Sequence, residues 1–132
     1  MSRKNTGFTL VEILIVVIIL GILAAIVIPQ FTEASDDART SALASDLQTI
    51  RAQLELYKMQ HAGAYPADLV TALTTSDGTY GPYMTKFPSN PFVTGAKAST
   101  VDTTTLGGGT AGWFYEQATG TVKPDDDAHT GL

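Results

Sequence analysis

Cysteine is absent from the 132 residues, so the chain has no disulfide, no thiolate metal ligand and no cysteine nucleophile. Histidine is almost absent, with only His61 and His129, which are far apart in the sequence. We find no catalytic constellation around either one and predict that both are surface residues rather than bases or ligands. These absences argue against an enzyme.

Basic residues are also scarce, with eight Lys and Arg against thirteen Asp and Glu and a formal net charge of −5. Arg3 and Lys4 precede an apolar run, and the other basic residues are scattered without forming a stripe. Nucleic-acid binding depends on clustered positive charge that meets the phosphates. No nucleic-acid partner is therefore expected.

The chain is rich in apolar residues near its start. No polar side chain occurs from Ile13 to Ile28, and the apolar run reaches back to Phe8 with only Thr9 and Glu12 interrupting it. A helix over residues 8–28 would be about 31 Å long, close to the hydrocarbon thickness of a bilayer. The remaining residues are too few to surround such a helix, and the run lacks a good signal-peptide cleavage site. We predict that residues 8–28 span a membrane once, with Arg3 and Lys4 on the cytoplasmic side.

Glu12 is out of place in this run, because an unpaired carboxylate at membrane depth costs at least a few kcal/mol. Two interpretations are open on the residues alone. The carboxylate has a specific charged partner, or it lies near the interface and reaches water or takes up a proton.

The hexapeptide GFTLVE at positions 7–12 follows a short basic leader and precedes the long apolar run. This N-terminus resembles the type IV pilin class, which includes pilins and the pseudopilins of type II secretion systems, and the resemblance is closest over residues 4–31. It implies that residues 1–7 are a leader peptide and that a prepilin peptidase cuts between Gly7 and Phe8 and methylates the Phe8 amine. It also implies that an inner-membrane assembly platform adds the subunits to a helical filament, which makes the chain a homo-oligomer.

The resemblance gives Glu12 a partner, because the Phe8 amine of a neighbouring subunit would carry a positive charge. In a medium of low dielectric constant the two charges attract strongly, and an unpaired one is strongly penalised. Phe8 and Glu12 are therefore the predicted filament-assembly residues, and their pairing would fix the register of helices that could otherwise slide.

The helical pattern continues beyond the apolar run. Pro29 predicts a kink or a locally open turn, or the end of the membrane segment, and the resemblance favours continuation. Beyond it, apolar residues recur at helical spacing, namely Leu43, Leu47, Ile50, Leu54 and Tyr57. Gly63 is a stop signal, so the long helix is predicted over residues 8–60.

The rest of the chain, residues 61–132, is predicted to be a small globular domain. We expect a short helix or turn over 67–73, an ordered aromatic loop over 80–92 and a flexible surface loop over 94–111. Residues 111–116 and 120–123 are predicted to form a C-terminal β-hairpin. The predicted fold class is α+β and pilin-like, with the long helix packed on a small antiparallel sheet.

The only acidic cluster of this domain is Asp125, Asp126 and Asp127. Three carboxylates are weak calcium candidates, because calcium needs six to eight oxygens in a shaped loop and consecutive residues point in different directions. We favour a solvated polar tail, with no cofactor and with calcium as the alternative.

Three classes of function compete. A membrane-anchored hydrolase lacks a catalytic constellation, and an anchored binding module would not need the Gly7–Phe8 junction or Glu12. The resemblance favours a structural subunit of the type II secretion pseudopilus, a periplasmic filament that drives protein export together with minor pseudopilins. The alternative is a type IV pilin, which forms surface pili for adhesion, motility or DNA uptake.

Overall fold

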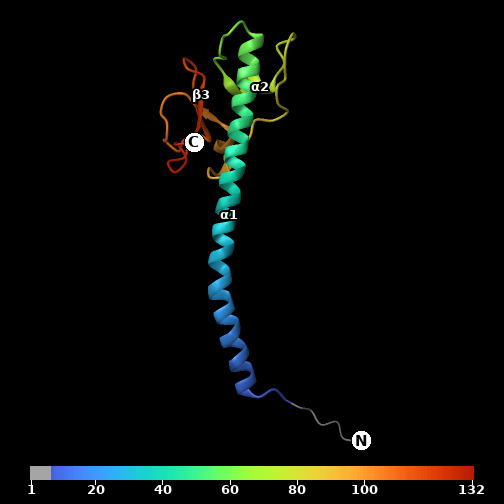
Figure 1. The fold of residues 1–132 in the computed structure, drawn as a ribbon, viewed down its shortest axis with the longest axis vertical. Coiled ribbons are helices and arrows are strands. Elements are labelled where there is room, and N and C mark those ends of the chain that lie inside the picture. Colours follow the sequence, from blue (N-terminus) through green and yellow to red (C-terminus); the bar gives the residue numbers. More distant parts are fainter. Residues whose placement is uncertain (1–6) are drawn as a thin grey trace, which may run out of the picture. The chain divides into compact units, whose positions relative to one another are not determined.

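One long helix, α1 (Leu10–Gln60), dominates the computed structural model, which describes residues 7–132 (Figure 1). The predicted helix over 8–60 is confirmed to within two residues. The helix continues through Pro29, as the resemblance implies. Proline lacks the N–H that would close one helical bond, and the Thr32 hydroxyl donates to the Ile28 carbonyl oxygen nearby at 3.2 Å. Arg3 and Lys4 and the leader before Gly7 lie outside the described residues.

Internal contacts divide the chain into two units, one ending at Ala38 and the other comprising Arg39–Leu132. The described part of the first unit is the short start of the chain and the helix alone. The second unit contains the C-terminal part of α1, the sheet and all the buried core residues.

The end of α1 is fixed by backbone geometry. Ala62 takes a positive φ of 55° and Gly63 one of 85°, and the Gly63 N–H bonds the Lys58 carbonyl at 2.8 Å. This six-to-one bond is the Schellman arrangement that satisfies a terminal carbonyl. The stop predicted at Gly63 is confirmed.

The core of the second unit forms where the apolar stripe of α1 meets the sheet. Leu43, Leu47, Ile50 and Leu54 are at most 2% exposed. They pack in one cluster with buried residues of the following elements, namely Leu69, Leu73, Phe87, Trp113, Tyr115 and Val122. The predicted role of the stripe as core is confirmed.

Two short segments cover this core. Helix α2 (Leu69–Thr74) begins at Asp68, whose carboxylate accepts from the Thr71 N–H at 3.2 Å, and it buries Leu69 and Leu73. Residues 80–92 have no helix or strand, but Phe87 is buried, so the predicted ordered loop is confirmed.

The sheet has three strands in the order β1 (Val101–Asp102), β2 (Trp113–Glu116) and β3 (Thr121–Pro124). Strands β2 and β3 form the predicted antiparallel hairpin, and Trp113 and Tyr115 alternate into the core. Strand β1 pairs with β2 in parallel, so the sheet is mixed rather than purely antiparallel.

The stretch 94–111, predicted as a flexible surface loop, is structured over much of its length. It contains the 3-10 helix η1 (Gly95–Ser99) and strand β1, and Ala98 is buried. The prediction was wrong because the small and threonine-rich composition concealed main-chain contacts to distant residues.

Candidate functional site

The predicted cleavage junction lies in a non-helical segment just before α1. Residues 7–9 carry no regular structure, and the Phe8 side chain is 84% exposed. Among the described residues, nothing beyond its chain neighbours lies within 4 Å of the position a Cβ would take at Gly7. An exposed, non-helical peptide bond beside a glycine is accessible to a peptidase.

Thr9 and Glu12 form a reciprocal cap at the start of α1. The Glu12 carboxylate accepts from the Thr9 N–H at 2.8 Å and from the Thr9 hydroxyl at 2.7 Å. The Glu12 N–H in turn donates to the Thr9 hydroxyl oxygen at 3.2 Å. This is a capping box, in which residues three apart satisfy free N–H groups of a helix start.

The capping box gives Glu12 a partner within its own chain. The carboxylate lies at the helix N-terminus, where the unsatisfied N–H groups carry positive partial charge. Two polar contacts to Thr9 reduce the cost of placing the acid near the membrane. The Thr-x-x-Glu spacing is a sequence signal of this cap, so the contact could have been predicted from residues 9–12.

The helix that follows offers a continuous apolar surface. Between Ile13 and Ile28 the large apolar side chains are 42% to 64% exposed, so nothing in the described chain packs on them. By length and composition α1 is the one described helix able to cross a membrane. Its apolar N-terminal part is consistent with inner-membrane anchoring.

The predicted solvated tail at Asp125 is wrong, because this carboxylate is fully buried. Its Oδ1 accepts from the Gly107 N–H at 2.8 Å and its Oδ2 from the Ala111 N–H at 3.1 Å. The Asp125 carbonyl oxygen also accepts from the Gly109 N–H at 3.1 Å. One side chain thus ties the glycine-rich loop, residues 107–109, to the end of β3.

Asp126 is also held by specific contacts. Its Oδ2 accepts from the buried Asn90 amide at 2.8 Å, and its Oδ1 forms a short hydrogen bond with His129 Nδ1. The His129 ring stacks on Phe92 with centroids 4.1 Å apart, so the predicted surface residue is half-buried and held by neighbours. Hydrogen bonds to Asn90 and His129 lower the pKa of the Asp126 carboxyl against the opposing effect of its burial, which is the largest single influence.

The three aspartates do not fit a calcium site in this arrangement. Asp125 and Asp126 already use both carboxylate oxygens to accept from N–H groups, whose hydrogens would repel a cation. Asp127 is exposed. Among residues 7–132 no three His, Cys, Asp or Glu side chains are placed to share a metal ion.

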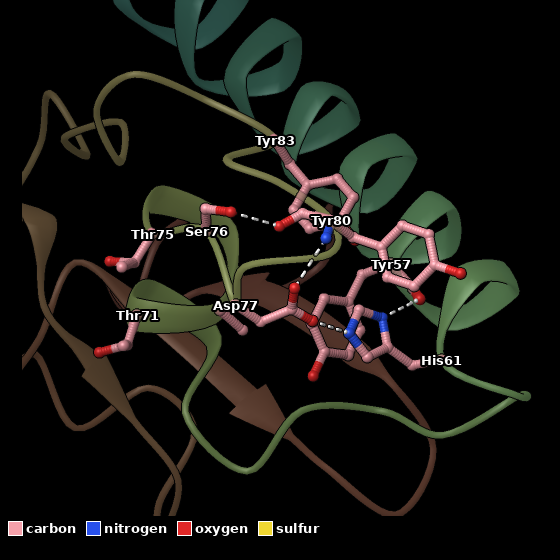
Figure 2. A pocket seen from close by; sticks show the side chains of 9 residues that line it. Tyr57, His61, Thr71, Thr75, Ser76, Asp77, Tyr80 and Tyr83 are labelled. Atoms are coloured by element: carbon pink, nitrogen blue, oxygen red, sulfur yellow. Dashed lines mark hydrogen bonds and ion pairs between the residues drawn. The ribbon is translucent and has the colours of Figure 1, made fainter.

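His61 lies in a pocket of about 150 Å³ near the end of α1 (Figure 2). Its ring stacks on Tyr57 at 3.8 Å, with Nδ1 2.9 Å from the Tyr57 carbonyl oxygen and Nε2 2.9 Å from Asp77 Oδ2. Asp77 raises the pKa of His61, with a smaller contribution from the Tyr57 carbonyl. Because both neighbours are acceptors, the doubly protonated ring suits this position best.

Asp77, in the loop after α2, is the partner of His61 Nε2. The N–H groups of Tyr80 and Thr79, and then His61, lower the pKa of Asp77 to about 2. The pair joins the end of α1 to this loop, so the half-buried His61 has a structural role.

Helix α1 is apolar and long enough to cross a membrane in its N-terminal part, and its C-terminal part packs on a small sheet. A Gly-Phe junction precedes it, and an acid is the fifth residue when Phe8 is counted as the first. Together these features define a type IV pilin-like subunit. The Prokaryotic N-terminal methylation motif matches residues 2–28. The chain belongs to the type IV pilin-like family and is a homologue of the major pseudopilin, type II secretion system core protein G.

Individual relatives differ in how much of their length is matched. The core protein G of Vibrio cholerae is 32% identical over 120 residues, covering 80% of this chain and 82% of that protein. The core protein G of Pseudomonas aeruginosa is 46% identical over 65 residues, which is 49% of this chain and 45% of that protein. The type IV narrow pilus major component of Thermus thermophilus is 30% identical over 107 residues, covering 81% of this chain and 92% of that protein. No solved structure gives a significant match.

Pseudopilins are structural, non-enzymatic proteins, so the hydrolase hypothesis is set aside. Family membership implies prepilin processing and assembly into a filament. It also supports inner-membrane anchoring through the N-terminal helix.

Proposed function

We propose that the chain is cleaved between Gly7 and Phe8, methylated on Phe8 and polymerised into the periplasmic pseudopilus of a type II secretion system. The observation that carries this proposal is the exposed Gly7–Phe8 junction, placed directly before a capped apolar helix that the described chain leaves uncovered. A helix that is apolar on every side must be surrounded by lipid in the membrane and by other helices in the filament.

Within the filament, the Glu12 carboxylate pairs with the methylated Phe8 amine of a neighbouring subunit. The capping box supports this proposal, because Thr9 fixes the carboxylate beside the first residue of the processed chain. A fixed carboxylate loses less conformational freedom when its charged partner arrives.

Two substitutions separate capping from charge pairing. Glu12→Gln keeps an acceptor at the third helical position, so it retains a capping box without the charge, whereas Glu12→Ala loses both. If the charge pair assembles the filament, both variants are cleaved but yield few filaments in a sheared and pelleted cell fraction. Normal filament yield from Glu12→Gln would show that Glu12 serves only as a cap.

The partners of this filament are the prepilin peptidase, the inner-membrane assembly platform and the minor pseudopilins. We propose no metal, because the carboxylates of Asp125 and Asp126 already accept from N–H groups. Cells lacking the chain should then retain export substrates in the periplasm, and their full release to the medium would contradict the secretion role.

A surface pilus is the second candidate, since the alignment with the Thermus pilus component covers 92% of that protein. Treating intact cells with protease distinguishes the two. A periplasmic filament is protected by the outer membrane, whereas a surface pilus is digested.

A further inference from the structure

A groove of about 370 Å³ lies between α1 and the ordered loop of residues 80–92, within the unit Arg39–Leu132. Asp46 and Thr49 line its helical side. The loop contributes a largely apolar wall with one cation at its edge, namely Met84, Phe87, Pro88 and Lys86.

The Asp46 carboxylate in this groove has no partner in the described chain. It is partly buried, and it makes no hydrogen bond or ion pair with any of residues 7–132. Burial raises the pKa of Asp46, and no hydrogen bond opposes this effect. The other acids of residues 39–132 that are at least partly buried are Asp102, Asp125 and Asp126, and all three accept hydrogen bonds.

A partly desolvated and unpaired carboxylate destabilises the subunit that contains it. A cation that enters the groove would recover this cost, because the attraction is stronger away from bulk water. The groove therefore favours a basic side chain from outside the subunit.

Several basic side chains of the chain already bind other groups, so fewer are available to pair with Asp46. Arg51 bonds the Val122 carbonyl oxygen, Lys58 bonds Tyr65, and Lys123 bonds the Thr130 carbonyl oxygen. Within residues 7–132, the basic side chains without such a contact are Arg39, Lys86 and Lys97.

Arg39 suits the groove best among these three. Its guanidinium can bond both oxygens of a carboxylate at once, and its stem can lie along apolar side chains such as Phe87 and Pro88. Arg39 is exposed on α1 seven residues before Asp46, on the same face and about 10.5 Å away along the axis. Two full turns separate the residues, so they are not neighbours within one helix.

We propose that Arg39 of one copy enters the groove of a second copy and pairs with the Asp46 carboxylate there. This inference rests on the proposed filament, in which the copies are parallel. The contact joins different residues of the two copies, so it repeats along a filament and does not close into a dimer. Parallel helices that meet in this way are displaced by about 10.5 Å at the contact.

Charge reversal tests the pair. Asp46→Arg and Arg39→Asp should each lower the yield of sheared filaments about tenfold or more, and the double variant should restore most of it. Lys97→Gln is the control, because Lys97 is an exposed basic residue outside the groove, and it should leave the yield unchanged. Failure of the double variant to recover, or a loss in Lys97→Gln equal to that in Asp46→Arg, would overturn the pairing.

Two further readouts separate this inference from the proposed function. If the wild-type chain is cleaved but makes no filament, the proposed function fails and the contact with it. If the wild-type chain polymerises and Asp46→Asn polymerises equally well, the contact alone is wrong. Asp46→Asn should leave subunit stability unchanged or higher while filament yield falls, whereas a purely structural role would lower both.

Discussion

Replacing Asp125 by alanine removes the side chain that holds the glycine-rich loop against the end of β3. Two main-chain donors, the N–H groups of Gly107 and Ala111, lose their acceptor, and Ala111 is itself buried. A hydrogen bond to a charged group contributes about 1.5–3 kcal/mol, and a buried donor left without a partner keeps its desolvation cost. We therefore expect the free energy of unfolding to fall by about 3–5 kcal/mol.

For a unit of this size, such a loss lowers the melting temperature by more than about 10 °C. Trp113 is the single tryptophan and is fully buried, so its fluorescence during urea unfolding of the full chain in detergent reports the core directly. Asp127→Asn is the control, because the neighbouring Asp127 is exposed and should change stability by less than about 0.5 kcal/mol. An Asp125→Ala variant as stable as this control would refute the reasoning.

Three further outcomes follow from the same unit. Calcium or a chelator should leave the unfolding midpoint of the wild-type chain unchanged, and a clear rise with calcium would show a metal site. The raised pKa of His61 means that its contribution to stability is complete below the unfolded value of 6.5 and is lost as pH rises through the higher folded value. The unfolding midpoint should therefore fall as pH rises above 6.5 more in the wild type than in His61→Gln, and equal slopes would contradict the pairing with Asp77. Gly112→Ala should lower the free energy of unfolding by more than about 2 kcal/mol, because a Cβ would lie 1.9 Å from the Ala98 carbonyl oxygen. At Gly131 a Cβ would meet open space, so Gly131→Ala should match the wild type in the same urea titration.

The N-terminal half of this molecule could be predicted because its signals are local. The apolar run and the spacing of Leu43, Leu47 and Leu54 are properties of one helix, and the Gly7–Phe8 junction directly precedes it. Such periodic patterns determine a helix and its buried face before any long-range contact is known. The hairpin was predicted for a similar reason, since its strands are close in the sequence.

The C-terminal loops could not be predicted, because their structure depends on contacts between distant residues. Asp125 accepts from Gly107, and Asn90 reaches Asp126 across 36 positions. Main-chain N–H groups carry no sequence signal, so an acid that binds them resembles an acid in a solvated tail. The capping box at Thr9 and Glu12 differs, because its spacing was available in the sequence.

Intact-mass and N-terminal analysis of the protein recovered from its own cells tests the central claim most directly. A mature chain that begins with N-methylated Phe8 is the predicted result, and it would place a charged amine four residues before Glu12. A chain that still begins at Met1, or one cut after Ala24 or Ala25, would contradict the account of a processed filament subunit.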